Sequence, residues 1–156
     1  MKAFRFRLES LLHLRGLTRE RALKEYANAI HDRQLAEARC KELTDRLRQI
    51  EDMVADLRNE GISGHDQAIF LASIEYAKDA LAKQNEVLRL ALEDEELKRS
   101  SYVEADVAEK TMLRLKERRQ EEHLHEQAAK EERSLEDVIG SRYSVISPTE
   151  ISHETA

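Results

Sequence analysis

Apolar residues recur at alternating steps of three and four along most of the chain, which is the spacing of a coiled-coil seam. A narrow stripe of this kind, sustained over several heptads, predicts two long helices that pack against each other. The first stripe contains Tyr26, Ala29, Ala36, Cys40, Leu43, Leu47, Ile50, Val54 and Leu57, and the second contains Phe70, Ile74, Ala77, Leu81, Leu88, Ala91, Tyr102, Ala105 and Met112.

Polar residues interrupt both stripes. Arg33 occupies a position of the first stripe, and Gln84, Glu95 and Lys98 occupy positions of the second. Each of them either buries a polar group or opens the interface locally, and both outcomes reduce the free energy gained by pairing. We therefore expect a helix pair that is only marginally stable on its own.

One break, in the segment NEGISGHDQ, separates the two stripes. Gly61 suits the left-handed conformation that ends a helix, and Ser63 and Asp66 have the spacing of a capping box. We therefore predict an all-α fold, a long two-helix antiparallel coiled-coil hairpin over residues 1–139. The first helix covers about 4–59, the turn 60–65 and the second helix about 66–139. Gly16 marks a weaker site, where the first helix kinks or restarts.

The end of the chain has a different character from the stripes. The residues up to Gly140, EQAAKEERSLEDVIG, are polar with little apolar face, and the second helix overshoots the first by about 20 Å at ~1.5 Å per residue. Such an end needs either solvent or a host. From Gly140 on, Ser, Thr and the lone Pro148 predict a flexible, disordered tail over 140–156.

Composition supports a long helical protein rather than a compact globule. Charged residues make up 37% of the chain and aromatic residues 4%, with one proline and no tryptophan, which is typical of coiled coils. Cys40 is the only cysteine, so an intrachain disulfide is excluded and a reducing compartment is favoured.

No motif for catalysis or metal binding stands out. The sequence lacks a phosphate-binding loop, a nucleophile elbow, a zinc-protease motif and a calcium loop. Within EEHLHE, Glu122 and His125 form one Glu-x-x-His step, but a di-iron bundle needs two such steps and two further glutamates. His123 and His125 also point to different faces of a helix. We predict no catalytic residue, no metal, no cofactor and no small-molecule substrate.

The first residues, MKAFRFRLESLLHLR, are basic and apolar although the chain carries a net charge of −6. Charged residues interrupt the apolar run, so it is neither a secretory signal nor a membrane span, and we expect a soluble, unprocessed chain. Nucleic acid is not an expected partner, because acidic residues follow the basic KERR at 116–119 and no stacking aromatics accompany it. Binding to a membrane surface through the first residues is a minor alternative.

Residues at both ends of the predicted hairpin form a recognisable combination. The chain begins Phe4-x-Phe6-x-Leu8-x-x-Leu11-Leu12-x-x-Arg15, with Glu20 shortly after, and later contains Leu115-Lys116-Glu117-Arg118-Arg119 and Glu131-Glu132-x-x-Leu135-Glu136-Asp137. This combination, over roughly residues 4–139, resembles the flagellar export protein FliJ family. Gly16 departs from the pattern, because it interrupts a stretch that the family normally keeps helical.

The resemblance implies a role and a set of partners. Family members are non-catalytic cytoplasmic coiled coils of the flagellar type III export apparatus, peripherally associated with the inner membrane, and they resemble the central stalk of rotary ATPases. Both chain ends enter the hexameric export ATPase ring, while other surfaces contact the membrane export gate protein and export substrate chaperones. The implied ring-binding residues are Phe4, Arg5, Phe6, Arg7, Leu8 and Leu11 on the first helix, and Lys116, Arg118, Arg119 and Leu135 on the second.

Three alternatives stay open on the sequence alone. Phe4 and Phe6 can serve only to staple the N-terminus onto the second helix, although that packing is compatible with a role in the ring. The chain can also be the equivalent stalk of a virulence type III secretion system. A generic coiled-coil scaffold without an ATPase partner is the third reading.

Overall fold

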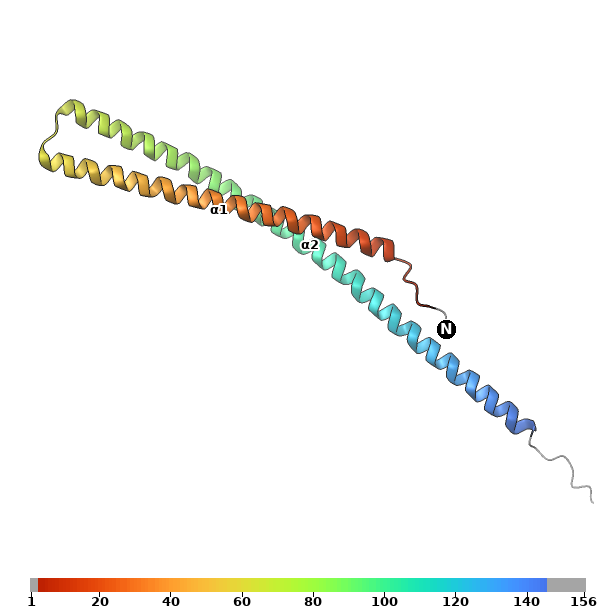
Figure 1. Ribbon diagram of the computed structural model, residues 1–156. Coiled ribbons are helices and arrows are strands. Elements are labelled where there is room, and N and C mark those ends of the chain that lie inside the picture. The colour runs from red at the N-terminus through yellow and green to blue at the C-terminus, as the bar shows by residue number, and fades with distance from the viewer. Residues whose placement is uncertain (1–2, 146–156) are drawn as a thin grey trace, which may run out of the picture. The chain divides into compact units, whose positions relative to one another are not determined.

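The computed structural model describes residues 3–145, and two helices account for nearly all of them: α1 (Glu9–Glu60) and α2 (Gly64–Val145) (Figure 1). No strand occurs in that range. The chain divides into two compact units. One, called here the terminal unit, combines Met1–Leu12 with Lys110–Ala156, and the other, the hairpin unit, is His13–Glu109. Each helix contributes to both units.

The hairpin unit contains the turn between the helices, and its local chemistry is the one predicted. Gly61 has a φ of 85°, the left-handed conformation, and its N–H donates to the Arg58 carbonyl at 3.3 Å. The Asp66 N–H donates to the Ser63 hydroxyl at 3.2 Å, which caps the start of α2. The box is modified, because the Ser63 hydroxyl itself donates to the Asp66 carboxylate at 2.7 Å. From this turn α1 and α2 run antiparallel (Figure 1), so the predicted hairpin is confirmed.

The first helix begins at Glu9, so the predicted start near residue 4 is wrong. Residues 3–6 have no regular secondary structure, and the helix is entered through a turn in which the Glu9 N–H donates to the Phe6 carbonyl at 3.2 Å. The physical reason lies in the spacing of Phe4 and Phe6. Residues two apart share a face in an extended chain but point to nearly opposite sides of a helix. Extension therefore lets both rings face the same side.

The second helix continues to Val145, so the predicted end at 139 and the predicted tail from 140 are wrong for residues 140–145. A glycine inside a helix costs only about 1 kcal/mol relative to alanine, and α2 passes through Gly140 without a break. The hydroxyls of Ser141 and Ser144 donate to the carbonyls of Val138 and Ser141 at 3.0 and 2.9 Å. The remainder of the predicted tail, 146–156, lies outside the described residues.

The helices meet along the predicted seam. Ala29, Ala36, Cys40 and Val54 are buried, with 3–8% of their surface exposed. The other seam positions are half-buried, and so are the polar ones, Arg33, Gln84, Glu95 and Lys98. The half-buried apolar seam residues of the hairpin unit are Tyr26, Leu43, Leu47, Ile50, Leu57, Phe70, Ile74, Ala77, Leu81, Leu88, Ala91, Tyr102 and Ala105. Met112 is the half-buried seam residue of the terminal unit.

α1 runs through Gly16 without interruption, so the predicted restart does not occur. The residue instead makes room for a side chain of α2. A Cβ added at Gly16 would lie 3.2 Å from Oε1 of Glu109, and Glu109 pairs with Arg19 one turn further along α1 at 3.3 Å. The glycine thus accommodates an ion pair between the helices. Among residues 3–145, neither helix contains a stretch apolar enough to cross a membrane.

Candidate partner-binding site

In the terminal unit the extended N-terminal segment lies against α2. Residues 3–8 and one face of α2 line a common surface pocket. The ring of Phe4 lies 5.7 Å from the imidazole of His123 between centroids, with the two planes tilted by 48°. The α2 residues in the lining are Leu115, Arg119, Glu122, His123 and Glu126.

The segment alternates in exposure, residue by residue. Phe4 and Phe6 are half-buried, whereas Arg5 and Arg7 are exposed. This period of two is the pattern of an extended chain lying on a surface, with apolar side chains facing inward and charged ones facing solvent. No ion pair of Arg5 or Arg7 occurs within the described part of the chain. The two guanidinium groups are therefore available to a binding partner.

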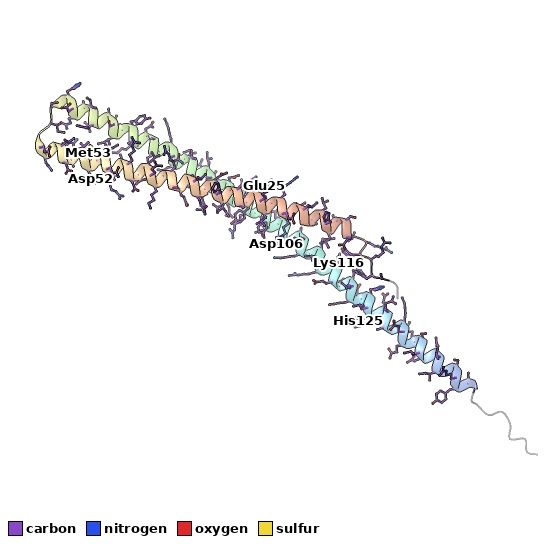
Figure 2. All side chains as sticks on the ribbon, in the orientation of Figure 1. Glu25, Asp52, Met53, Asp106, Lys116 and His125 are labelled. Carbon is purple, nitrogen blue, oxygen red and sulfur yellow. The ribbon has the colours of Figure 1, made fainter. Side chains whose placement is uncertain are left out.

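An ion pair fixes the point where the segment becomes α1. The Lys116 ammonium lies 2.8 Å from the carboxylate of Glu9, the first residue of the helix. Figure 2 labels Lys116 on α2. A carboxylate in the first turn also interacts favourably with the positive end of the helix dipole. Leu8 and Leu11 are exposed near this junction, while Leu12 is buried. The segment is thus held by the ring contact of Phe4 with His123, by the half-buried Phe6 and by one ion pair.

Arg118 and Arg119 of α2 share one acidic partner. Arg119 hydrogen-bonds to Glu122 at 2.9 Å, and Arg118 lies 3.4 Å from the same carboxylate. Both arginine side chains are more than half exposed, so solvent screens these pairs and they contribute little to stability. Their main effect is to hold two positive groups beside the pocket.

The structure brings together some of the predicted ring-binding residues and separates others. Phe4, Arg5, Phe6, Arg7, Leu8 and Arg119 line the pocket, and Lys116 is tied to it through Glu9. Leu11 and Arg118 lie beside it without lining it. Leu135 is exposed and about 24 Å further along α2 at ~1.5 Å per residue. Every described side chain from Lys130 to Ser144 is exposed.

The sequence analysis missed His123 as a contact of the N-terminal segment. The signal for it was present, because Met112, Lys116, Arg119 and His123 continue the steps of four and three beyond the last predicted seam position. His125 lines a different surface pocket, with Glu121, Leu124 and Ala128. The two histidines therefore do face different sides. No group of side chains suited to a metal ion occurs among the described residues.

The comparison that decides the family covers the whole described helical region. A family model described as the flagellar FliJ protein matches residues 4–145, from the first aromatic residue of the N-terminal segment to the last residue of α2. The chain belongs to the FliJ family. No curated protein and no solved structure matches it significantly. FliJ membership confirms the resemblance seen at the two chain ends, and together with the two-helix hairpin it fits a component of flagellar protein export.

Proposed function

We propose that the protein is a non-catalytic stalk of the flagellar type III export apparatus, which binds and stimulates the hexameric export ATPase through its terminal unit. FliJ-family membership supports this role. The observation that carries it is the exposure pattern of the N-terminal segment, in which the aromatic side chains pack on α2 and the arginines face outward. Two chain ends that are far apart in sequence thus form a single contact surface.

The two kinds of side chain have separate tasks in this proposal. Phe4 and Phe6 order the segment on α2, so little conformational entropy is lost when a partner binds. Arg5 and Arg7 meet acidic groups around the lumen of the ring, with Arg119 beside them. Arginine is enriched among the residues that dominate interfaces, and charged contacts at a rim mainly set the association rate and its salt dependence.

Further contacts follow from the family rather than from this geometry. We propose that other surfaces bind the membrane export gate protein and the export substrate chaperones. The protein would then act in the cytoplasm, peripherally associated with the inner membrane. A stalk of a virulence type III system is the second candidate, and the family match to a flagellar protein favours the flagellar assignment over it. A generic scaffold would have no effect on an ATPase.

The test is the turnover rate of the purified cognate export ATPase with and without the full chain. We expect stimulation by the wild-type protein. Phe4→Ala with Phe6→Ala should abolish it, because the segment loses its two apolar anchors on α2. Circular dichroism should show an intact helical protein, since neither residue lies within α1. No effect of the wild-type chain on turnover would contradict the stalk role. Normal stimulation by a folded double variant would show that Phe4 and Phe6 only pack the N-terminus onto α2.

A further inference from the structure

A second heptad stripe runs along α2 in the hairpin unit, about a third of the way around the helix from the seam with α1 at ~100° per residue. Its positions follow the same alternating steps of four and three as the seam. They are Ile69, Ser73, Tyr76, Ala80, Lys83, Val87, Leu90, Asp94 and Leu97. We call this set the outer stripe. It extends over roughly four heptads, or about 42 Å.

The large apolar residues of the outer stripe are exposed. The exposed fractions are 52% for Ile69, 78% for Tyr76, 50% for Val87, 52% for Leu90 and 68% for Leu97. Scattered exposed leucines are normal on a protein surface, but apolar residues in heptad register along one helix face are typical of an interface with another helix. Near the turn, Ile69 and Tyr76 also line a surface pocket with Arg39 and Arg46 of α1.

We propose that the part of the outer stripe from Ala80 to Leu97 binds the same part of a second copy of this chain, with the two α2 helices antiparallel. The two charged residues inside the stripe supply the argument. Lys83 and Asp94 have opposite charges and lie symmetrically about a point between Leu88 and Arg89, which is the middle of the part of the stripe from Ala80 to Leu97. A two-fold axis at that point sets Lys83 of each copy opposite Asp94 of the other, which gives two such pairs.

The same axis matches the apolar positions. Leu90 comes opposite Val87 of the second copy at the centre, and Ala80 comes opposite Leu97 further out, each again twice. A parallel pair in register would instead set Lys83 against Lys83 and Asp94 against Asp94. Like charges in a helix interface oppose pairing, so the charge pattern selects the antiparallel arrangement.

Neighbouring charges do not oppose this arrangement strongly. In the single chain, Lys83 lies 3.1 Å from Asp79, and both side chains are largely exposed, so this weak pair gives way to Asp94 of the second copy at little cost. Glu86 and Glu93 lie along the outer edge of the stripe, where two copies bring them near each other. Arg89 pairs with both of them within the same helix, which offsets much of their repulsion.

The test is sedimentation equilibrium of the full chain over a range of concentrations. We expect the mass to rise from 18.1 kDa towards twice that value as the concentration increases. Leu90→Glu places a charge at the centre of the interface and should weaken dimerisation at least about tenfold. Leu92→Glu is the matched control, because Leu92 is equally exposed on the opposite side of α2, and it should leave the dissociation constant unchanged.

Charge reversal tests the pairing itself. Lys83→Asp alone and Asp94→Lys alone should each weaken dimerisation, because each creates two like-charge contacts, and the double variant should restore it. A chain that stays monomeric at all concentrations would overturn the proposal and leave the stripe to a different protein. Failure of the double variant to recover would overturn the antiparallel register. Neither readout involves the ATPase, so the proposed stalk role stands or falls separately.

Discussion

The two halves of the seam between α1 and α2 in the hairpin unit differ in chemistry. Near the turn the seam is apolar, from Cys40 to Leu57 on α1 and from Phe70 to Leu81 on α2. Further from the turn, ion pairs between the helices take over. Arg33 contacts Glu95, Lys98 lies 3.5 Å from Glu25, and Arg19 lies 2.9 Å from Asp106 and 3.3 Å from Glu109.

The two halves therefore have different roles, one in the stability of the hairpin and the other in the register between α1 and α2. We expect the larger apolar side chains in the half near the turn to contribute most of the free energy of folding, because this contribution grows with the apolar area removed from water. Ion pairs demand specific partners, and they contribute less because desolvation offsets much of the attraction. A hydrogen bond to Asp106 raises the pKa of Arg19. Hydrogen bonds to Glu37 and, second in size, to Glu95 raise the pKa of Arg33. The half distant from the turn therefore fixes which residues face each other.

The largest effect is expected in the apolar half. Leu47→Ala should lower the free energy of unfolding by about 2 kcal/mol, because a two-helix seam has few other apolar residues to fill the space. Thermal unfolding followed by circular dichroism measures the change. Leu35→Ala is the matched control, since Leu35 is exposed on the same helix and its loss should change little. An unchanged melting temperature for Leu47→Ala would show that this half does not carry the stability.

A smaller effect of opposite sign is expected in the polar half. Replacing Arg33 and Glu95 together by leucine should raise the free energy of unfolding, since an apolar pair avoids the desolvation penalty of a half-buried ion pair. Glu95 Oε2 is buried and makes no hydrogen bond of good geometry, which adds to that penalty. Arg33→Leu alone should destabilise, because it leaves a carboxylate without its partner. Unfolding in low and high salt measures both, and loss of stability in the double variant would remove the distinction between the halves.

The smallest effect concerns the glycine in the polar half. Gly16→Ala should raise the free energy of unfolding by about 0.5 kcal/mol, the helix preference of alanine being partly offset by displacement of Glu109. The displacement is inexpensive because the nearest atom, 3.2 Å away, is the end of a flexible side chain. Chemical denaturation of the two proteins gives the difference. A clear loss of stability would mean that the contact of Arg19 with Glu109 matters more than its exposure suggests.

Much of the fold follows from the sequence because few residues determine it. Heptad spacing sets the seam, and Gly61 with Ser63 sets the turn, all through local geometry. The start of α1 could not be predicted in this way. The spacing of Phe4 and Phe6 favours an extended segment only if a helix surface is there to receive both rings, and that surface comes from residues more than a hundred positions away.

The same limit applies to the candidate site and to Gly16. The resemblance identified the basic and aromatic residues of the N-terminal segment, but not which of them face α2 and which face solvent. His123 was not predicted as a contact of this segment because its partner is a ring distant in sequence. Gly16 suggested a kink from its conformational freedom, whereas its role depends on the reach of Glu109 from the other helix. The sequence pattern thus did not predict the contacts between segments that are distant in the chain.

The most direct test of the proposed stalk role is the stimulation of the export ATPase by an N-terminal charge reversal. Arg5→Glu with Arg7→Glu keeps both half-buried phenylalanines and reverses the two exposed charges. Lys41→Glu with Arg48→Glu makes the same change of charge at exposed positions of the hairpin unit and serves as the control. We expect the first variant to lose most of its stimulation of ATPase turnover and the control to retain it. Equal stimulation by both variants would contradict the claim that the outward-facing arginines of the terminal unit bind the ring.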